Sequence, residues 1–405
     1  MPFYQSPGVY IQEVAGTPPI AGVGTSTAGF IGIVDDTIAN LDGTPFKMPE
    51  KPTPPPLPPA PLPALTYYAV APVEAPCLVT NWEQFKNQFG EPQAGNLTLA
   101  HAVYGFFNNL GTRCWVARVT NITNVNSIGR VLKKFEAIDE IALALAPGAL
   151  TKGVQDAIAD HCKNLGDRFA ILDGLRVNPP TTTASVQGTT SNNPYAAMYF
   201  PWIEVNDLSD SNGKRTLFVP PSGHIAGIYA RVDQQRGVHK APANEVVQGA
   251  LSLEYSTSKS EQDGLNPGGI NVIRNLNGAI RVWGARTLGG DAQGEYKYIN
   301  VRRTMNFIEE SIDEGTQFAV FEPNNIALWQ QLKRAVTAFL TIVWRDGALF
   351  GDTAEQAFFV RCDAGLNPPE VRDLGQVIVE VGVAIVRPAE FVIFRISQFT
   401  GPAAQ

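Results

Sequence analysis

The stretch IALALAPGALTKGVQDAIADHCKNLGDRFAIL, residues 141–172, decides the fold class. It begins and ends with short apolar runs, Ile141 to Ala146 and Arg168 to Leu172, which are typical of buried strands. Val154 to Leu165, between them, has the length and spacing of a helix. A strand, a helix and a second strand of these lengths predict a right-handed parallel crossover. The body of the protein is therefore expected to be a layered α/β structure.

Similar patterns precede this unit. Ala28 to Val34 is a continuous apolar run, as expected for a strand that is buried on both faces. Helices are predicted at Asn81 to Phe89 and at Leu97 to Leu110, and a further strand at Cys114 to Val119. These elements extend the α/β body toward the N-terminus.

The last third of the chain is the most regularly patterned part. Arg303 to Glu314 and Ile326 to Trp344 are predicted helices, and Asn325 and Gly347 can cap the two ends of the second one. The apolar stripe of that helix consists of Trp329, Leu332, Val336, Phe339, Leu340 and Val343. Val377 to Ile385 alternates with the period of two that is typical of a strand.

Both chain ends have the character of strand-like arms. Pro7 to Val14 is a short strand pattern, and Gly16 to Gly24 behind it is too rich in glycine and proline to hold a packed element. Phe391 to Ile396 is a second strand-like run, separated from the preceding strand by Pro388. We therefore expect an arm at each end of the chain.

A proline-rich segment interrupts the N-terminal half. From Pro45 to Pro63 there are ten prolines, so this segment can form neither the interior of a helix nor that of a sheet. We expect an extended surface loop or spacer, the core of an insertion over residues 42–66. Recognition of other proteins through this loop, in a soluble adaptor, is one alternative function.

The composition excludes several classes of function. With 405 residues, the chain exceeds what one core usually organises, so two or three domains are expected. A net charge of -7 provides no excess of Lys and Arg for phosphate contacts, so nucleic acid is not an expected partner. The start of the chain does not resemble a signal peptide and no apolar run could span a bilayer, so we expect a cytoplasmic origin and no membrane insertion.

No cofactor and no metal are expected. Cys77, Cys114, Cys162 and Cys362 are widely separated, and we expect them to be reduced, buried thiols. The histidines lack the spacing of metal ligands. Asp207 to Gly213 lacks the acidic spacing of an EF-hand loop and is expected to be an Asx-rich turn.

A series of motifs runs through almost the whole chain. In order they are Pro7-Gly-Val-Tyr-Ile-Gln-Glu-Val, Thr25-Ser-Thr-Ala-Gly-Phe-Ile-Gly, Phe106-Phe-Asn-Asn-Leu-Gly, Val116-Ala-Arg-Val, Pro220-Pro-Ser-Gly-His-Ile-Ala-Gly-Ile-Tyr-Ala-Arg-Val-Asp, Arg236-Gly-Val-His-Lys-Ala-Pro-Ala, Asn271-Val-Ile-Arg, Trp283-Gly-Ala-Arg-Thr, Arg302-Arg-Thr-Met-Asn-Phe-Ile-Glu-Glu-Ser-Ile and Phe321-Glu-Pro-Asn-Asn. In this order and spacing they resemble the contractile tail sheath family of phages, R-type bacteriocins and extracellular contractile injection systems. The proline-rich insertion departs from the common core of that family.

The resemblance implies a subunit of two parts. An outer α/β domain with subtilisin-like topology would span residues 25–284, and an inner α+β sheath domain would span residues 285–388. The N-terminal arm, residues 1–24, and the C-terminal arm, residues 389–405, would complete the inner domains of neighbouring subunits with strands.

The resemblance also implies a structural function. Such a subunit polymerises as stacked hexameric rings around an inner tube and contracts to drive the tube through a target envelope. Its partners would be further copies of itself, the inner tube protein, and baseplate and terminal cap proteins. It would assemble in the bacterial cytoplasm and end in a phage virion, an extracellular particle or a cell-anchored injection system.

Particular residues are expected to carry this function. The strands exchanged between subunits would use Val9, Tyr10, Ile11, Gln12, Val14, Phe391, Val392, Ile393, Phe394 and Ile396. Hinges are expected at Gly16, Pro18, Pro19, Gly22, Gly24 and Pro388. Candidate tube-facing charges are Glu309, Glu310, Asp313, Glu314, Lys333 and Arg334, although solvated helix faces would have the same pattern.

A hydrolase is the second alternative, because the sheath body is related in topology to subtilisin. Ser222, His224 and Asp233 are the residues that could contribute to catalysis. Ser222 and His224 lie side by side, the chain order of a subtilisin triad is absent, and so is a GxSxG elbow. We therefore expect no catalytic residues and no enzymatic activity.

Overall fold

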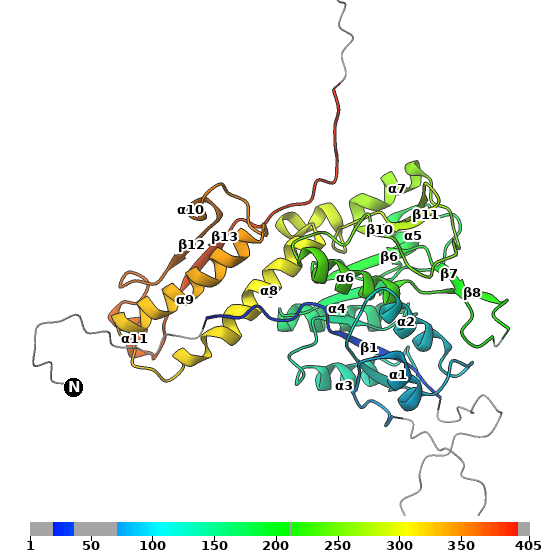
Figure 1. Ribbon diagram of the computed structural model, residues 1–405, viewed down its shortest axis with the longest axis horizontal. Coiled ribbons are helices and arrows are strands. Elements are labelled where there is room, and N and C mark those ends of the chain that lie inside the picture. The colour runs from blue at the N-terminus through cyan, green and yellow to red at the C-terminus, as the bar shows by residue number, and fades with distance from the viewer. Residues whose placement is uncertain (1–18, 36–70, 211, 396–405) are drawn as a thin grey trace, which may run out of the picture. The chain divides into compact units, whose positions relative to one another are not determined.

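The computed structural model describes residues 19–35, 71–210 and 212–395, which form two units (Figure 1). Of the described residues, 19–22 and 310–384 belong to unit 1, and 23–35, 71–210, 212–309 and 385–395 belong to unit 2. The strand predicted at Pro7 to Val14 and the insertion at 42–66 lie outside the described residues. The domain boundaries predicted from the sequence remain a proposal.

Unit 2 is built on an eight-stranded sheet with the order β11-β10-β6-β5-β4-β1-β3-β2. Its strands are β1 Ala28–Ile33, β2 Cys77–Val79, β3 Cys114–Val119, β4 Leu143–Leu145, β5 Phe169–Asp173, β6 Ala196–Phe200, β10 Ile270–Leu276 and β11 Ala279–Val282. The strands from β10 to β3 are parallel, and β2 and β11 add antiparallel edges. The predicted parallel pairing of the two strands is confirmed, because β4 and β5 pair in parallel with Leu143 opposite Phe169.

Helices cover both faces of this sheet. Phe30 and Ile31, which are adjacent in β1, belong to two separate apolar clusters because successive side chains of a strand point to opposite faces. Helices α1 Trp82–Phe89, α2 Leu97–Asn108 and α6 Ser222–Arg236 pack in the cluster of Phe30, whereas α3 Val125–Phe135 and α4 Lys152–Leu165 pack in that of Ile31. The result is a three-layer α/β/α body, as the sequence predicted.

The remaining elements of unit 2 lie around these layers. They are the three-stranded sheet of β7 Ile203–Asn206, β8 Thr216–Val219 and β9 Ser252–Leu253, the helices α5 Thr183–Gln187 and α7 Lys259–Leu265, and the 3-10 turns η1 Asn266–Gly268 and η2 Gly290–Tyr296. The predicted Asx-rich turn joins β7 to β8, where Asp210 accepts bonds from the amides of Asn212, Lys214 and Arg215. Helix α8, Ile299–Thr316, contains the boundary between the two units.

Unit 1 is smaller and more open. It contains the end of α8, η3 Gln317–Ala319, α9 Ile326–Arg345, α10 Ala354–Ala357, β12 Phe358–Arg361, α11 Pro369–Asp373 and β13 Glu380–Val383 (Figure 1). All six residues of the predicted stripe on α9 are buried, and the Asn325 side chain caps the helix by accepting from the Leu328 amide. Strands β12 and β13 pair antiparallel and form a two-stranded sheet.

The strand predicted over Val377 to Ile385 is shorter than expected. Only Glu380–Val383 is a strand, because its partner β12 offers just the residues Phe358–Arg361. The amide of Ile378 donates instead to the side chain of Asn367, at 2.7 Å. The alternation correctly predicted a strand, but the strand is only as long as its pairing with β12.

Helices α2 and α6 approach each other closely enough for their backbones to touch. A Cβ atom added at Gly227 would lie 2.4 Å from the carbonyl oxygen of Phe106, and one added at Gly223 would lie 2.4 Å from that of Ala102. Nearly all of α6 is buried, from Ser222 to Val232. The two glycines are therefore required by the packing and not by a turn.

We predict that Gly227→Ala lowers the free energy of unfolding by about 1–3 kcal/mol, because the added methyl group has to push the two helices apart. Gly129→Ala is the matched control, since a Cβ at Gly129 in α3 meets nothing within 4 Å. Gly129→Ala should raise the free energy of unfolding by up to about 1 kcal/mol, because alanine has a higher helix propensity than glycine. Chemical denaturation measures both variants, and equal effects at the two positions would contradict the packing argument.

Candidate assembly site

The residues considered for hydrolysis do not form a catalytic arrangement. The Ser222 hydroxyl donates to Asp173 Oδ2 at 2.8 Å, and its amide donates to Asp173 Oδ1 at 2.9 Å. His224 is buried against Gly105 and its Nδ1 has no partner among the described residues, while burial lowers its pKa to about 3. Asp233 is paired with Arg303. No histidine is therefore placed to activate the serine.

The edge of the sheet where ligands usually bind is also occupied, by contacts within the protein itself. In open α/β sheets, ligands bind outside the carboxyl ends of the strands. Here Asp173, at the carboxyl end of β5, receives the amides of Gly148 and Ser222 as well as the Ser222 hydroxyl. These bonds lower the pKa of Asp173, but burial raises it by more, so the pKa is about 6. The carboxylate thus serves to attach the start of α6 to the sheet.

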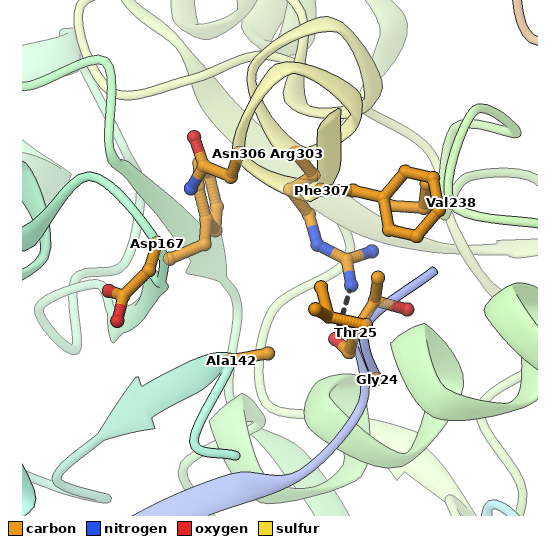
Figure 2. Close-up of a pocket in the computed structure, with 10 residues that line it drawn as sticks. Gly24, Thr25, Ala142, Asp167, Val238, Arg303, Asn306 and Phe307 are labelled. Carbon is orange, nitrogen blue, oxygen red and sulfur yellow. Dashed lines mark hydrogen bonds between the residues drawn. The ribbon is translucent and has the colours of Figure 1, made fainter. Parts of the chain in front are cut away.

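The structure anchors the N-terminal arm where it enters the body. The Thr25 hydroxyl donates to Asp233 Oδ2 at 2.7 Å, and Arg303 donates to the Thr25 carbonyl oxygen at 2.9 Å (Figure 2). Arg303 also forms a salt bridge with Asp233, and both side chains are almost fully buried. The exposed Gly24, just before this anchor, has nothing within 4 Å of a Cβ position. The bonds with Asp233 and Arg303 fix the chain at Thr25, three residues before the start of β1.

A small cavity lies beside this anchor. Its lining includes Thr25, Ala142 and Asp167 near the amino ends of the strands, and Arg303 and Asn306 from α8 (Figure 2). Its volume of about 20 Å³ gives room for roughly one water molecule. It is thus too small to be a substrate pocket.

The C-terminal arm has an anchor of a different kind. The Glu390 carboxylate accepts two bonds from Arg286, at 2.8 and 2.9 Å, one from the Tyr298 hydroxyl at 2.9 Å and one from the Asn266 amide group at 2.8 Å. Burial alone would raise the pKa of Glu390, but these bonds outweigh it and lower the pKa. Four residues upstream, the Val386 carbonyl oxygen accepts from Asn300 at 3.1 Å.

Beyond Glu390 the chain is exposed. Phe391, Val392, Ile393 and Phe394 retain 69%, 69%, 80% and 81% of their accessible surface. They follow an extended path and no strand includes residues 391–395 (Figure 1). The predicted strand thus has no partner within the described part of the chain. Ile396 and the N-terminal candidates Val9, Tyr10, Ile11, Gln12 and Val14 lie outside the described residues.

The small sheet of unit 1 has open edges. Among the described residues, β12 has no main-chain partner strand besides β13, and just past β13 the Ala384 carbonyl oxygen accepts from the Phe350 amide at 2.7 Å. Phe358 and Val360 of β12 are buried, whereas Phe359 is 53% exposed. One face of this sheet is thus packed, and its edge is able to accept another strand.

The expected hinge residues have different surroundings. Pro19, Gly22 and Gly24 are exposed, but Pro388 lies between the anchored residues Val386 and Glu390. Gly16 and Pro18 lie outside the described residues. The hinge assignments remain a proposal.

The candidate tube-facing charges lie on α8 and α9. Glu309 is paired with Arg302 at 2.8 Å, and burial raises the pKa of Glu309 despite that pair. Glu310 is half-buried, whereas Asp313 and Glu314 are exposed in the last turn of α8. Lys333 and Arg334 are exposed and lie together on the outer face of α9. Asp313, Glu314, Lys333 and Arg334 are therefore accessible to a partner, whereas Glu309 is exposed but engaged with Arg302.

Some anchoring residues were missed by sequence reasoning. Arg286 and Glu390 are 104 positions apart, and no local pattern relates them. A signal was nevertheless present, because Thr25, Asp233, Arg286 and Arg303 all lie within the motifs listed from the sequence. A charged residue that is buried with an apolar motif requires a partner, because charged side chains are almost never fully buried unless they are paired.

Three of the four cysteines are buried, as the sequence predicted, and one is not. Cys114, Cys162 and Cys362 are buried free thiols, whereas Cys77 at the edge of the sheet is only half-buried. In the described ranges, no group of three or more His, Cys, Asp or Glu side chains could hold a metal ion. No helix within those ranges is long and apolar enough to cross a membrane.

Two domain families match consecutive parts of the chain. The phage tail sheath protein central domain matches residues 123–288, and the phage tail sheath C-terminal domain matches residues 291–399. A prophage major tail sheath protein of Pseudomonas aeruginosa (strain UCBPP-PA14) is 26% identical over 266 residues. This match covers 63% of the present chain and 64% of the Pseudomonas protein, which is less than two thirds of its length.

Solved structures match nearly the whole chain. The sheath complex of the PVC extracellular contractile injection system in the contracted state has a TM-score of 0.74 and 27% identity, covering 98% of this chain and 99% of that one. A chain of the six-fold symmetrised baseplate of the anti-feeding prophage has a TM-score of 0.73 and 27% identity, covering 98% and 100%. These matches confirm the mixed α/β fold class.

The buried carboxylate of Asp173 predicts a pH dependence. Its folded pKa of about 6 exceeds the roughly 3.9 of an unfolded aspartate, so the folded state binds more protons and stability falls as pH rises between these values. Asp173→Asn removes this titration. We predict that the free energy of unfolding of the original protein, relative to this variant, falls by about 2 kcal/mol from pH 4 to pH 7.

Urea denaturation at several pH values measures this difference. Asp263→Asn, at an exposed aspartate of α7, is the control for losing one carboxylate. If the free energy of unfolding of the original protein, relative to the Asp173→Asn variant, rises with pH, Asp173 is not a buried group with a raised pKa.

Proposed function

The chain belongs to the phage tail sheath family, and on this premise we propose that it polymerises as stacked hexameric rings around an inner tube and contracts to drive that tube through a target envelope. Proteins of this family are structural sheath subunits and not enzymes, which agrees with the filled carboxyl edge of the sheet. The six-fold symmetry of the anti-feeding prophage baseplate supports hexameric rings. The observation that carries the proposal is the exposed apolar run Phe391 to Phe394 in a chain that also has open strand edges.

The C-terminal arm is the proposed donor strand. Its four apolar side chains lie in sequence on an extended segment, and leaving them in water is unfavourable. Full burial of such side chains contributes about 1.5–3 kcal/mol each. Their burial against another subunit therefore supplies a substantial part of the assembly energy. In the same proposal, Val9, Tyr10, Ile11, Gln12 and Val14 of the N-terminal arm form the second donor.

The β12–β13 sheet is the proposed acceptor. A sheet of two strands is only marginally stable by itself, and an added strand pairs the main-chain groups at its edge. A strand of about five residues would form four or five main-chain bonds, worth on the order of 1 kcal/mol net each. The exposed ring of Phe359, which packs over Gly382, offers an apolar surface beside that edge.

Strand donation of this kind would produce an assembly that extends without closing into a ring. The donor surface and the acceptor surface differ, so each contact is heterologous, and heterologous contacts that do not close produce helical assemblies. Two arms on each subunit would link it to several neighbours. The joints can persist while subunits rotate, provided that flexible residues connect each arm to its body.

The proposed parts follow the chain. Residues 25–284 form the outer, subtilisin-like domain, and residues 285–388 form the inner domain, with arms at 1–24 and 389–405. Gly16, Pro18, Pro19, Gly22, Gly24 and Pro388 are the proposed hinges, of which Gly22 and Gly24 lie just before the anchored Thr25. Baseplate and terminal cap proteins are the proposed end partners. Assembly takes place in the bacterial cytoplasm, and the finished subunit belongs to a virion, an extracellular particle or a cell-anchored system.

The proposed tube contact is electrostatic. Asp313 and Glu314 lie near the C-terminal end of α8, where the helix dipole disfavours negative charge, so cations of a partner would be favourable there. Lys333 and Arg334 offer the opposite charge on α9. Glu309 and Glu310 complete the proposed set, although Glu309 is engaged with Arg302. Exposed ion pairs of this kind are weak and screened by salt, which suits a contact that breaks on contraction.

We predict that Ile393→Asp abolishes polymerisation without unfolding the subunit, because a carboxylate would be buried in the donated strand. Leu251→Asp is the matched control, since Leu251 is also an exposed apolar side chain, at 52%, but lies outside the arm. Negative-stain electron microscopy measures polymer yield, and circular dichroism checks the fold. Normal polymers from the Ile393 variant would refute donation by this arm.

We predict that the double substitution Lys333→Glu and Arg334→Glu weakens docking to the inner tube protein by at least about tenfold at low salt, because two favourable charge contacts become repulsive. Lys214→Glu with Lys259→Glu reverses two exposed charges of unit 2 and is the control. Cosedimentation of purified tubes with sheath protein, at low and high salt, gives the measurement. Equal docking by both double variants would remove Lys333 and Arg334 from the tube contact.

A further inference from the structure

The two arms are anchored to unit 2 by chemically different contacts. Thr25 is held through its backbone and hydroxyl by an internal Arg303–Asp233 pair, and the buried strand β1 begins three residues later at Ala28. Glu390 is held only through its own side chain. Releasing Thr25 would disturb the buried sheet, whereas releasing Glu390 would break four side-chain contacts at the surface of the body.

The binding site for Glu390 is rigid on the side of the body. The Arg286 side chain is 4% exposed and holds the carboxylate through two of its nitrogens. Its remaining nitrogen donates to the Asn266 carbonyl oxygen and to Asp291, both at 3.1 Å. Bidentate arginine–carboxylate contacts of this kind fix orientation as well as distance. The position of Glu390 is therefore determined by a preformed guanidinium group.

Few other contacts hold the segment before Glu390. Arg387 and Ala389 are exposed, and Pro388 is half-buried. The Glu390 amide donates to the Pro388 carbonyl oxygen at 3.0 Å, which is a contact within the segment itself. The next anchor upstream is the Val386 carbonyl oxygen, which accepts from Asn300. Residues 387–390 thus form a loop that is closed by the Glu390 side chain.

We propose that Glu390 is the positioning residue that sets where the free part of the C-terminal arm begins, and that its release adds residues 387–390 to the length of that arm. The inference rests on the proposed donation of the arm to a neighbouring subunit. With Glu390 bound, the free part begins at Phe391. With Glu390 released, it begins after Val386.

The added length has a mechanical consequence. Residues 387–390 can extend by at most about 13–14 Å, at roughly 3.3–3.6 Å per residue. A subunit that moves relative to its neighbour could use this length while the donated strand stays paired. In the resting state, the bound Glu390 keeps the arm short and preorganised, which lowers the entropy lost when the strand is donated.

Glu390→Gln tests the proposal, because glutamine retains the size of the side chain but loses the charge-assisted contacts to Arg286. Hydrogen exchange of the unassembled full-length protein should show the amide of residue 390, which donates to the Pro388 carbonyl oxygen, exchanging at least about tenfold faster, with β13 unchanged. The protein concentration needed for polymerisation should rise by about tenfold. Glu370→Gln, at an exposed glutamate of α11, is the control for both measurements.

Two results would overturn the proposal. Exchange of the residue 390 amide that matches the Glu370 control would mean that the carboxylate does not hold the segment. Faster exchange with unchanged polymerisation would mean that the contact does not position the arm. Polymerisation after deletion of residues 391–405 would instead contradict strand donation itself, and the exchange result on the unassembled protein would remain valid.

Discussion

The proposed assembly depends on main-chain hydrogen bonds that the described part of a single subunit leaves unmade. Strands β12 and β13 form a sheet of two strands, and the outer edge of β12 has no main-chain partner among the described residues. The same chain carries Phe391 to Phe394 in extended form with 69–81% of their surface exposed. Unpaired edges and exposed apolar strands are both unfavourable in water. Pairing between subunits would relieve both costs at once.

In the proposed assembly, the α/β body is the support for strand exchange and not a catalytic centre. The contact of α2 with α6 through Gly223 and Gly227, together with the attachment of α6 to Asp173, fills the positions where other α/β proteins bind ligands. In this body, Arg286 and Arg303 each hold one terminal segment. In the proposed function, a fold class that often serves catalysis fixes the points from which the two arms leave.

Much of the fold was predictable because local periodicity determines it. The strand predicted at Cys114 to Val119 has those limits, and all six residues of the predicted α9 stripe are buried. Helix α6 was not expected, because it is buried on nearly every side and has no apolar stripe to detect. The strand over Val377 to Ile385 was predicted too long, because a partner of four residues limits it.

Phe391 to Ile396 was predicted as a strand, yet a strand requires a partner, and residues 391–395 have none within the described chain. The contact between Arg286 and Glu390 joins residues 104 positions apart, beyond the reach of local patterns.

The most direct test of strand exchange is a cryo-electron microscopy map of the polymer formed by the full-length chain, at a resolution that separates strands. The account predicts that residues 391–395 of one subunit are paired with the β12–β13 sheet of another. A map in which both terminal segments pair only with their own subunit, and no sheet is shared between subunits, would contradict it.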